Sequence, residues 1–314
     1  MIVALQPHLM ERAVFEAVRG DPALEPQYQR KFANCYSEQK FDKREIAFAD
    51  LHECWFRDLG LEKRISCILR EFKHIEAHVN RLAVTHAPSA RAHAMELFGA
   101  PGRFTIAMAI TPGLLLDCDA FSYWARHEFM HVDDMLDPAF AFAQGELPSG
   151  PNRAVRNLVQ DRLAVLWAMS VDARLTLRDL VPAFVRDKRC SEYLRAFALQ
   201  GDESGVEQFE ATWRESVESG LDFPSLMQWA REGPPSLRNR DLDGGTNVTR
   251  SAVGTVCPLC GFSTFDWGSR DDAQSVSVAV IGDFPTWTPS LGICARCVEV
   301  YRGGACAVQG SVRV

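Results

Sequence analysis

Apolar residues in the first quarter of the chain recur every three or four positions. This spacing puts them on one face of a helix, so the pattern predicts helices over residues 8–84. After a break at Ala87–Ser89, a further short helix is predicted over Arg91–Phe98. The apolar positions that carry the periodicity are Leu51, Cys54, Trp55, Leu59, Ile65, Ile68, Leu69 and Phe72.

The pattern changes at residue 99. The letters GAPG at 99–102 are typical of a turn, and RFTIAMAITPG is apolar and β-branched, which predicts a strand ending at Pro112–Gly113. A helix is then expected over Ala120–Leu136, because Asp137–Pro138 would end it. A loop over 139–152, a long helix over Arg153–Leu177 and further helices to about residue 229 complete this region.

Residues 231–251 differ in composition from the segments that precede and follow them. They are polar and rich in Gly and Pro, which is typical of an interdomain linker. The tail after them is short and turn-rich, and its segment SVSVAVIG predicts a strand. We therefore predict domains at 1–230 and 252–314 joined by a linker at 231–251. The expected fold class is α+β, with a mainly helical domain that contains a small sheet and a small β-rich tail.

Composition narrows the function classes. The chain has 314 residues, 47% hydrophobic and 24% charged, which is ordinary for a soluble folded protein. Its net charge of −7 gives no general attraction to nucleic acid or to an anionic membrane. No apolar run approaches the roughly 20 residues that span a bilayer, and the first 20 residues lack the apolar core of a signal peptide. A cytoplasmic location without membrane or nucleic-acid partners is expected.

The segment RHEFMHVDDMLDP contains a candidate catalytic metal site. On a helix, His127 and His131 lie one turn apart on the same face and could hold one zinc ion. Glu128 could then act as the general base for a zinc-activated water. Tyr123 shares this face and could donate to an oxyanion, although packing in the core would equally explain it. Arg126 and Arg174 are further candidates for this role, with salt bridges as the alternative.

The strand FTIAMAITPGLLL, the HEFMH helix and a later acidic helix together resemble the zincin metallopeptidases. The resemblance covers roughly residues 90–180 and is closest in outline to the gluzincins, whose third zinc ligand comes from a downstream helix. It implies a zincin-like fold, with the β-type segment before the motif as the edge strand that aligns the substrate. It also implies a zinc-dependent hydrolase that acts on a peptide or protein. The third histidine of metzincins and the Asn-Glu motif for the third ligand are both absent.

The third ligand is open among four acidic residues. Asp172 is preferred because its neighbours on the long helix are apolar, so burial there is costly unless the carboxylate is paired or bound to metal. Asp161 lies on the same face about 16 Å away, and Glu146 lies in the loop. Asp134 is too far along the HExxH helix to share an ion held by both histidines, so a contact to His131 is expected instead. An ion pair with Arg162 or Arg174 is the alternative for Asp172 and Asp161.

Four of the ten cysteines form two CxxC pairs, CPLC at 257–260 and CARC at 294–297. Two such pairs present four thiolates to one metal, which predicts a closed structural zinc site at Cys257, Cys260, Cys294 and Cys297, of the zinc-ribbon type. A redox dithiol or a disulfide is the alternative. The six other cysteines are expected to be small buried residues. Nearby aromatic residues are expected to cover the metal. An exposed few could bind a protein partner or, as the weaker alternative because the segment is not markedly basic, nucleic acid. These residues are Phe262, Phe265, Trp267, Phe284, Trp287 and Tyr301.

The leading hypothesis is thus a zinc-dependent hydrolase, in outline a metallopeptidase, with two zinc ions per chain. The first alternative is a non-catalytic zinc-binding regulatory or interaction protein that retains a zincin-like fold. Intact Glu128 favours the enzyme, since a pure scaffold needs no base beside the metal. A zinc hydrolase acting on a small amide is a third hypothesis.

Overall fold

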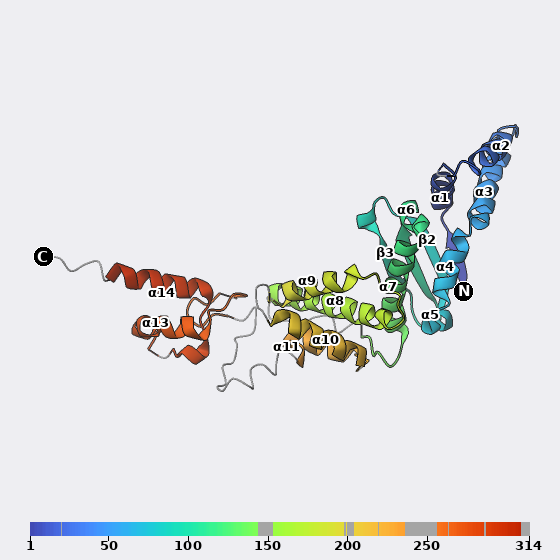
Figure 1. The fold of residues 1–314 in the computed structure, drawn as a ribbon. Helices are drawn as coiled ribbons and strands as arrows, with labels where there is room; N and C mark the ends of the chain where they lie inside the picture. Colours follow the sequence, from blue (N-terminus) through green and yellow to red (C-terminus); the bar gives the residue numbers. More distant parts are fainter. Residues whose placement is uncertain are drawn as a thin grey trace. The chain divides into compact units, whose positions relative to one another are not determined.

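The protein is mainly helical with one small mixed sheet, as the α+β prediction requires (Figure 1). The structure is a computed structural model that describes residues 1–19, 21–143, 153–197, 199, 204–218, 220–235, 256–262, 264–285 and 287–308. It divides into two compact units. Unit 1 comprises residues 1–142, 167–189 and 216–223, and unit 2 comprises residues 143–166, 190–215 and 224–314. The predicted linker at 231–251 lies mostly outside the described residues.

Unit 1 contains a four-stranded sheet in the order β1-β2-β4-β3. Strands β1 (Ile2–Leu5), β2 (Val79–His86) and β4 (Phe104–Ile110) run parallel, and β3 (Ala94–Phe98) pairs antiparallel with β4. Alternate residues of the central strands are fully buried, as a sheet with one covered face requires: Leu82, Val84, Ile106, Met108 and Ile110.

Three predictions about this sheet need correction. Residues 79–84 belong to a strand and not to the predicted helical region, and the predicted helix over 91–98 is replaced by the 3-10 turn η1 (Ala90–Ala92) and strand β3. The predicted strand at 103–113 exists as β4 but is interior, because β2 and β3 pair with its two sides. The edge strand next to it is therefore β3.

Six further helices belong to the described part of unit 1. The most buried of their side chains include Leu9, Phe56 and Ile65, which are at most 1% exposed. The helices are α1 (Pro7–Arg19), α2 (Glu25–Cys35), α3 (Phe41–Asp58), α4 (Leu61–Leu69), α5 (Lys73–His78) and α6 (Pro112–Leu116). Of these, α2 and α3 extend away from the sheet (Figure 1).

Helix α7 (Cys118–Leu136) carries the HExxH motif and confirms the predicted helix. It begins where the Asp117 carboxylate accepts a hydrogen bond from the Ala120 N–H at 3.0 Å, and it ends before Pro138. Phe121, Ala125 and Phe129 anchor its buried face. The long helix α8 (Arg153–Thr176) is also confirmed, and α9 (Phe184–Ala196), α10 (Gly205–Glu218) and α11 (Phe223–Glu232) follow.

The tail is helical where a β-rich module was predicted. Its described residues contain α13 (Arg270–Asp283), the 3-10 turn η4 (Pro289–Leu291), α14 (Ala295–Val308) and one antiparallel bridge, between Trp267 and Cys294. The segment SVSVAVIG lies in α13. A capping box formed by Ser269 and Asp272 starts this helix, and its buried residues Ala273, Val276 and Val280 recur at helical spacing.

The scattered cysteines are less buried than predicted. Cys35 is buried, but Cys54, Cys67 and Cys118 are exposed and Cys190 is half-buried. The side chain of Cys306 lies outside the described residues. As for the membrane, no helix in the described parts of the chain has both the length and the apolar character needed to cross a bilayer.

Candidate metal centre

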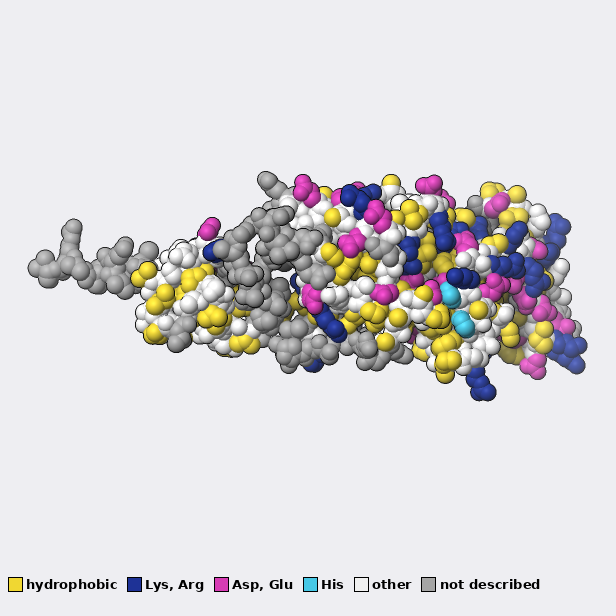
Figure 2. Space-filling model, turned by 90° about the horizontal axis from the view of Figure 1, so that it is seen from below, with side chains coloured by type: hydrophobic (Ala, Val, Ile, Leu, Met, Phe, Trp, Pro, Cys, Tyr) yellow, Lys and Arg dark blue, Asp and Glu magenta, His cyan; other side chains and the backbone are white. Residues whose placement is uncertain are grey.

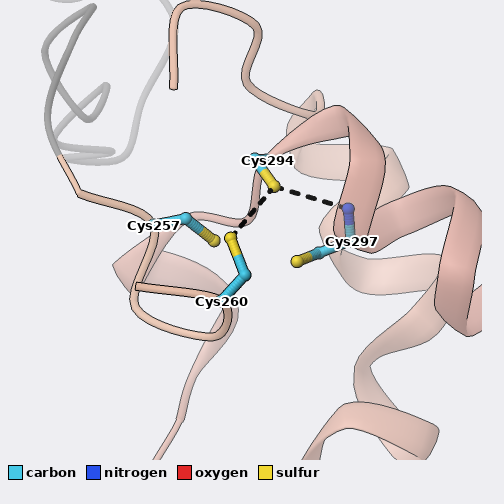
Figure 3. Close-up of side chains that lie close together, drawn as sticks. All are labelled: Cys257, Cys260, Cys294 and Cys297. Carbon is cyan, nitrogen blue, oxygen red and sulfur yellow. Dashed lines mark hydrogen bonds between the residues drawn. The ribbon is translucent and has the colours of Figure 1, made fainter. Parts of the chain in front are cut away.

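The two CxxC pairs meet in one cluster. Cys257 and Cys260 lie on a tight turn, Cys294 precedes α14 and Cys297 lies in its first turn. Figure 3 shows the four sulfur atoms directed toward a common centre. All four Sγ atoms lie within 4.8 Å of one another, and Cys260 Sγ is 3.8 Å from Cys294 Sγ.

These distances fit a tetrahedral metal ion. A zinc ion held at about 2.3 Å by four thiolates separates its sulfur ligands by about 3.8 Å. Cys257, Cys294 and Cys297 are at most 8% exposed, and Cys260 is half-buried. The four thiols therefore form a complete donor set with no position left for a substrate, as in structural zinc sites.

Local backbone geometry explains how the sequence builds the first pair. Gly261 adopts φ = 71°, which favours glycine, and its N–H donates to the Cys257 carbonyl at 2.9 Å. The Cys257 N–H in turn donates to the Phe262 carbonyl at 2.9 Å. In the second pair, the Cys297 N–H points at Cys294 Sγ, 3.4 Å away. Each turn thus presents its two sulfur atoms on the same side.

The four thiols are electrostatically unequal. Burial raises the pKa of Cys257, but backbone N–H groups of Cys260, Cys294 and Leu259 outweigh burial and lower this pKa to about 7. Burial together with neighbouring thiols raises the pKa values of Cys294 and Cys297. The Cys257 thiol is therefore ready to ionise near neutral pH, whereas Cys294 and Cys297 need a metal cation to stabilise their thiolates.

The aromatic residues of this module divide into a core and a surface. Trp287 is 3% exposed and donates its indole N–H to the Gly292 carbonyl at 2.9 Å, while Trp267 and Tyr301 pack against the cysteines. Phe262, by contrast, is 70% exposed, and Phe265 is also exposed. Figure 2 shows hydrophobic side chains spread over the visible face of this module, with few charged ones among them. The expected covering of the metal by aromatic residues is therefore only partial.

The HExxH residues lie together on α7, but they contact protein groups. The rings of His127 and His131 have centroids 4.9 Å apart, and the His131 ring packs edge-on against Trp167. Asp172, from α8, is completely buried, and its Oδ1 lies 2.8 Å from His127 Nδ1. The Tyr123 hydroxyl donates to both oxygens of Asp172 at 3.2 Å. The residues chosen from the sequence thus do converge around His127.

Arg189, on α9, completes this cluster and was missed in the sequence. Its Nε donates to Asp172 Oδ2 at 2.6 Å, and its Nη2 lies 3.4 Å from His127 Nε2. A buried aspartate in an apolar helix indicates a cationic partner, but the expected partners were Arg162 and Arg174. Nothing in the local sequence distinguishes Arg189, because the contact joins residues 17 positions apart on two helices.

The other acidic candidates have different partners. Asp134 accepts a bidentate pair from Arg174 at 2.8 and 2.6 Å, and a hydrogen bond from the Trp167 indole at 2.8 Å. Asp133 accepts from two backbone N–H groups at the start of α5. Asp161 is exposed and Glu146 lies outside the described residues. Arg126, proposed to help a transition state, pairs with Glu71.

The HExxH residues fit a zinc ion less well than the four cysteines do. Within the described residues, the four-cysteine cluster is the one group of metal-ligating side chains whose donor atoms converge. Asp172 contacts the Nδ1 side of His127, and the Arg189 cation faces the Nε2 side. Burial raises the pKa of Glu128 and lowers that of His131, where the charge of His127 acts in the same direction. The described HExxH residues do not form a three-donor metal site.

Comparison of the chain with protein-family models, with curated proteins and with solved structures gave no match.

Proposed function

We propose that this chain is a zinc-binding interaction protein whose C-terminal module is organised by a structural zinc ion at Cys257, Cys260, Cys294 and Cys297. The observation that carries the proposal is the convergence of four sulfur atoms at the spacing a tetrahedral ion needs. We propose zinc as the metal because four cysteine thiolates are its usual structural donor set.

The module also has a surface suited to a partner. A groove of about 430 Å³ runs beside the cysteines and is lined by apolar side chains, including Leu259, Phe262 and Val300. Phe262 is 70% exposed and Val300 is 62% exposed. Exposed apolar side chains that line one groove are typical of a binding surface, whereas single scattered ones are not. Among the described residues that line the groove, Arg296 is the one with a charged side chain. A protein segment with an apolar anchor and a nearby carboxylate fits these features.

Metal analysis of the freshly reduced full chain tests the proposal. We expect a zinc ion bound by four sulfur atoms, seen as a sulfur-only shell at about 2.3 Å in X-ray absorption. Zinc that is absent, or bound by nitrogen and oxygen at this site, would contradict it. Selection from a displayed peptide library tests the groove. Phe262→Ser should abolish the binding of selected peptides, whereas Val278→Ser on the exposed side of α13 should not.

A second candidate function, the zinc-dependent hydrolase, is favoured by one observation. Asp172 holds Nδ1 of His127, as carboxylates that orient metal-binding histidines do, and this orientation leaves Nε2 as the metal-facing nitrogen. In this proposal His127 and His131 bind zinc, Glu128 is the base and Tyr123 is an oxyanion donor. Arg189 would have to withdraw from His127. The third donor would be Asp172, after giving up its bond to His127, or Glu146.

The test of the hydrolase separates metal from catalysis. Glu128→Gln should keep any zinc bound at this site yet reduce hydrolysis of a broad peptide library by orders of magnitude. Glu71→Gln, which alters an exposed carboxylate paired with Arg126, is the matched control. Hydrolysis that survives the Glu128 change would exclude this mechanism. If the double variant Cys257→Ser with Cys260→Ser holds no zinc at all, the HExxH motif is not a metal site.

A further inference from the structure

A pocket far from both motifs in the sequence opens between α1, α2 and α3 of unit 1. Its volume is about 310 Å³. The lining residues include Glu11 from α1 and Phe32 from α2. Tyr36, which directly follows the end of α2, also lines it, as do Glu45, Phe48 and His52 from α3. The pocket therefore combines aromatic rings with two carboxylates, and neither proposed function uses it.

Three of its rings meet at steep angles. The ring of Tyr36 lies 5.6 Å from Phe32 and 5.1 Å from Phe48, with the planes at 75° in both pairs. Phe32 and Phe48 are 5.0 Å apart at 50°. All three rings line the pocket, and they meet one another edge-on or tilted, with none of the three pairs stacked. Tyr36 is 61% exposed, although an aromatic side chain of this size gains most from burial.

The charged side chains that line the pocket, among the described residues, are acidic. Glu11 and Glu45 line the pocket, and none of the described residues that line it is Lys or Arg. The nearest basic contact to these carboxylates is His8, whose Nδ1 lies 3.8 Å from Glu11. Burial lowers the pKa of His52, so its imidazole is neutral at neutral pH and does not repel a cation. The side chain of His52 is also held in place, by the Tyr28 hydroxyl at 3.1 Å from Nε2.

We propose that this pocket binds an organic cation of the methylated ammonium class. Aromatic faces attract such cations through the ring quadrupole, and the methyl groups are apolar enough to pack against the rings. The two carboxylates supply the counter-charge. A compact, strongly hydrated metal ion would make no use of the rings, and a neutral apolar ligand would make no use of the carboxylates. The same helices already show one cation over a ring, with Lys31 Nζ 5.4 Å from the Trp55 centroid.

The experiment compares choline with its neutral isostere, 3,3-dimethylbutan-1-ol, in calorimetric titrations of the full chain. The two ligands share shape, so binding of choline alone isolates the contribution of the charge. A short peptide that carries trimethyl-lysine is titrated in parallel, to distinguish a free small molecule from a modified protein side chain. Equal affinity for choline and the neutral alcohol, or no binding of choline and the peptide at millimolar concentration, would overturn the proposal.

Two substitutions test the residues that carry it. Tyr36→Leu should weaken choline binding about fivefold or more, because one ring face is removed. Glu45→Gln should also weaken it, with the largest loss at low salt, where the carboxylate matters most. Phe41→Leu and Asp50→Asn are matched controls, since both side chains are exposed on α3 outside the pocket. Circular dichroism checks that each variant is folded. Affinity unchanged in folded Tyr36→Leu protein would contradict the assignment.

Discussion

The four-cysteine cluster and the HExxH helix are both metal motifs in the sequence, but their donor atoms have different neighbours in the fold. The four cysteine sulfur atoms contact mainly one another and backbone N–H groups. Both nitrogens of His127 contact side chains, Asp172 on one side and Arg189 on the other. A CxxC turn positions two donors by local backbone geometry. HExxH positions only two of the three that a metal needs, and long-range packing decides what else reaches them.

The largest expected effect is the loss of zinc from the four-cysteine cluster. Cys257→Ser combined with Cys260→Ser removes half of the donor set, so the module should lose zinc and most of the folding free energy that zinc supplies, which is about 10–16 kcal/mol in small zinc domains. Loss of helical signal from α13 and α14 on zinc removal, with the unit 1 melting transition retained, is the expected measurement. A module that stays folded without metal would show that packing alone stabilises it.

A smaller effect on stability is expected around Asp172, beside the HExxH motif. Asp172→Ala removes a buried carboxylate that binds Arg189, His127 and Tyr123, so unit 1 should lose about 3–5 kcal/mol of unfolding free energy, measured by denaturant titration. Asp161→Ala, on the same helix but exposed, should change it by less than about 0.5 kcal/mol. The Cys257→Ser/Cys260→Ser protein leaves the HExxH motif as the remaining candidate zinc site. If Asp172 is the third ligand there, Asp172→Ala in that protein should sharply weaken zinc binding. Asp161→Ala should not.

Two glycines sharpen the description of the four-cysteine module. A Cβ added at Gly268 would lie 2.7 Å from Cγ2 of the buried Val298, so Gly268→Ala should destabilise the module by about 1–3 kcal/mol. A Cβ at Gly282 in α13 meets nothing within 4 Å, so Gly282→Ala should stabilise it by about 0.5 kcal/mol. Thermal melts of the zinc-loaded variants measure both, and equal effects would show that the packing around Gly268 is loose.

The smallest effect concerns pH in unit 1. Burial lowers the pKa of His52 below its ordinary value of 6.5, so the unfolded chain binds a proton more readily than the folded one. Stability should therefore fall as the pH drops below 6.5, by at most about 1.4 kcal/mol per pH unit for this one group. His52→Gln should reduce the slope of unfolding free energy against pH. An unchanged slope would mean that other groups dominate.

Elements whose signal is local were predicted well. The turn at 99–102, strand β4, and helices α7 and α8 all follow from spacing and from Gly or Pro at their ends. Strand β2 was hidden because it directly follows α5 and continues an apolar pattern of helical length. SVSVAVIG is β-branched, yet its start is fixed by the capping box at Ser269 and its burial has helical spacing. Capping and tertiary packing outweighed strand propensity there.

In the candidate sites too, features with a local sequence signal were predicted, and features that depend on long-range packing were not. The four cysteines converge, as their spacing predicts, because each pair is built by its own turn. Asp172 is buried and lies 2.8 Å from His127 Nδ1, which agrees with the cost of burying a carboxylate among apolar residues without a partner, while its role as the third zinc ligand stays a prediction. The role of Arg189 could not be predicted, because it depends on how α9 packs beside α8. The aromatic pocket depends in the same way on the packing of three helices.

The position of β1 has a consequence for how this chain folds as it is synthesised. Ile2 pairs with Arg81 in a parallel ladder, so the first strand cannot find its partner until about 80 further residues have left the ribosome. Parallel pairing over such a separation is a slow step, whereas the helices between the two strands can form locally. Until then β1 is an unpaired apolar segment. A bulky fusion placed directly before Ile2 would hinder this late pairing and leave an edge of β2 open to aggregation.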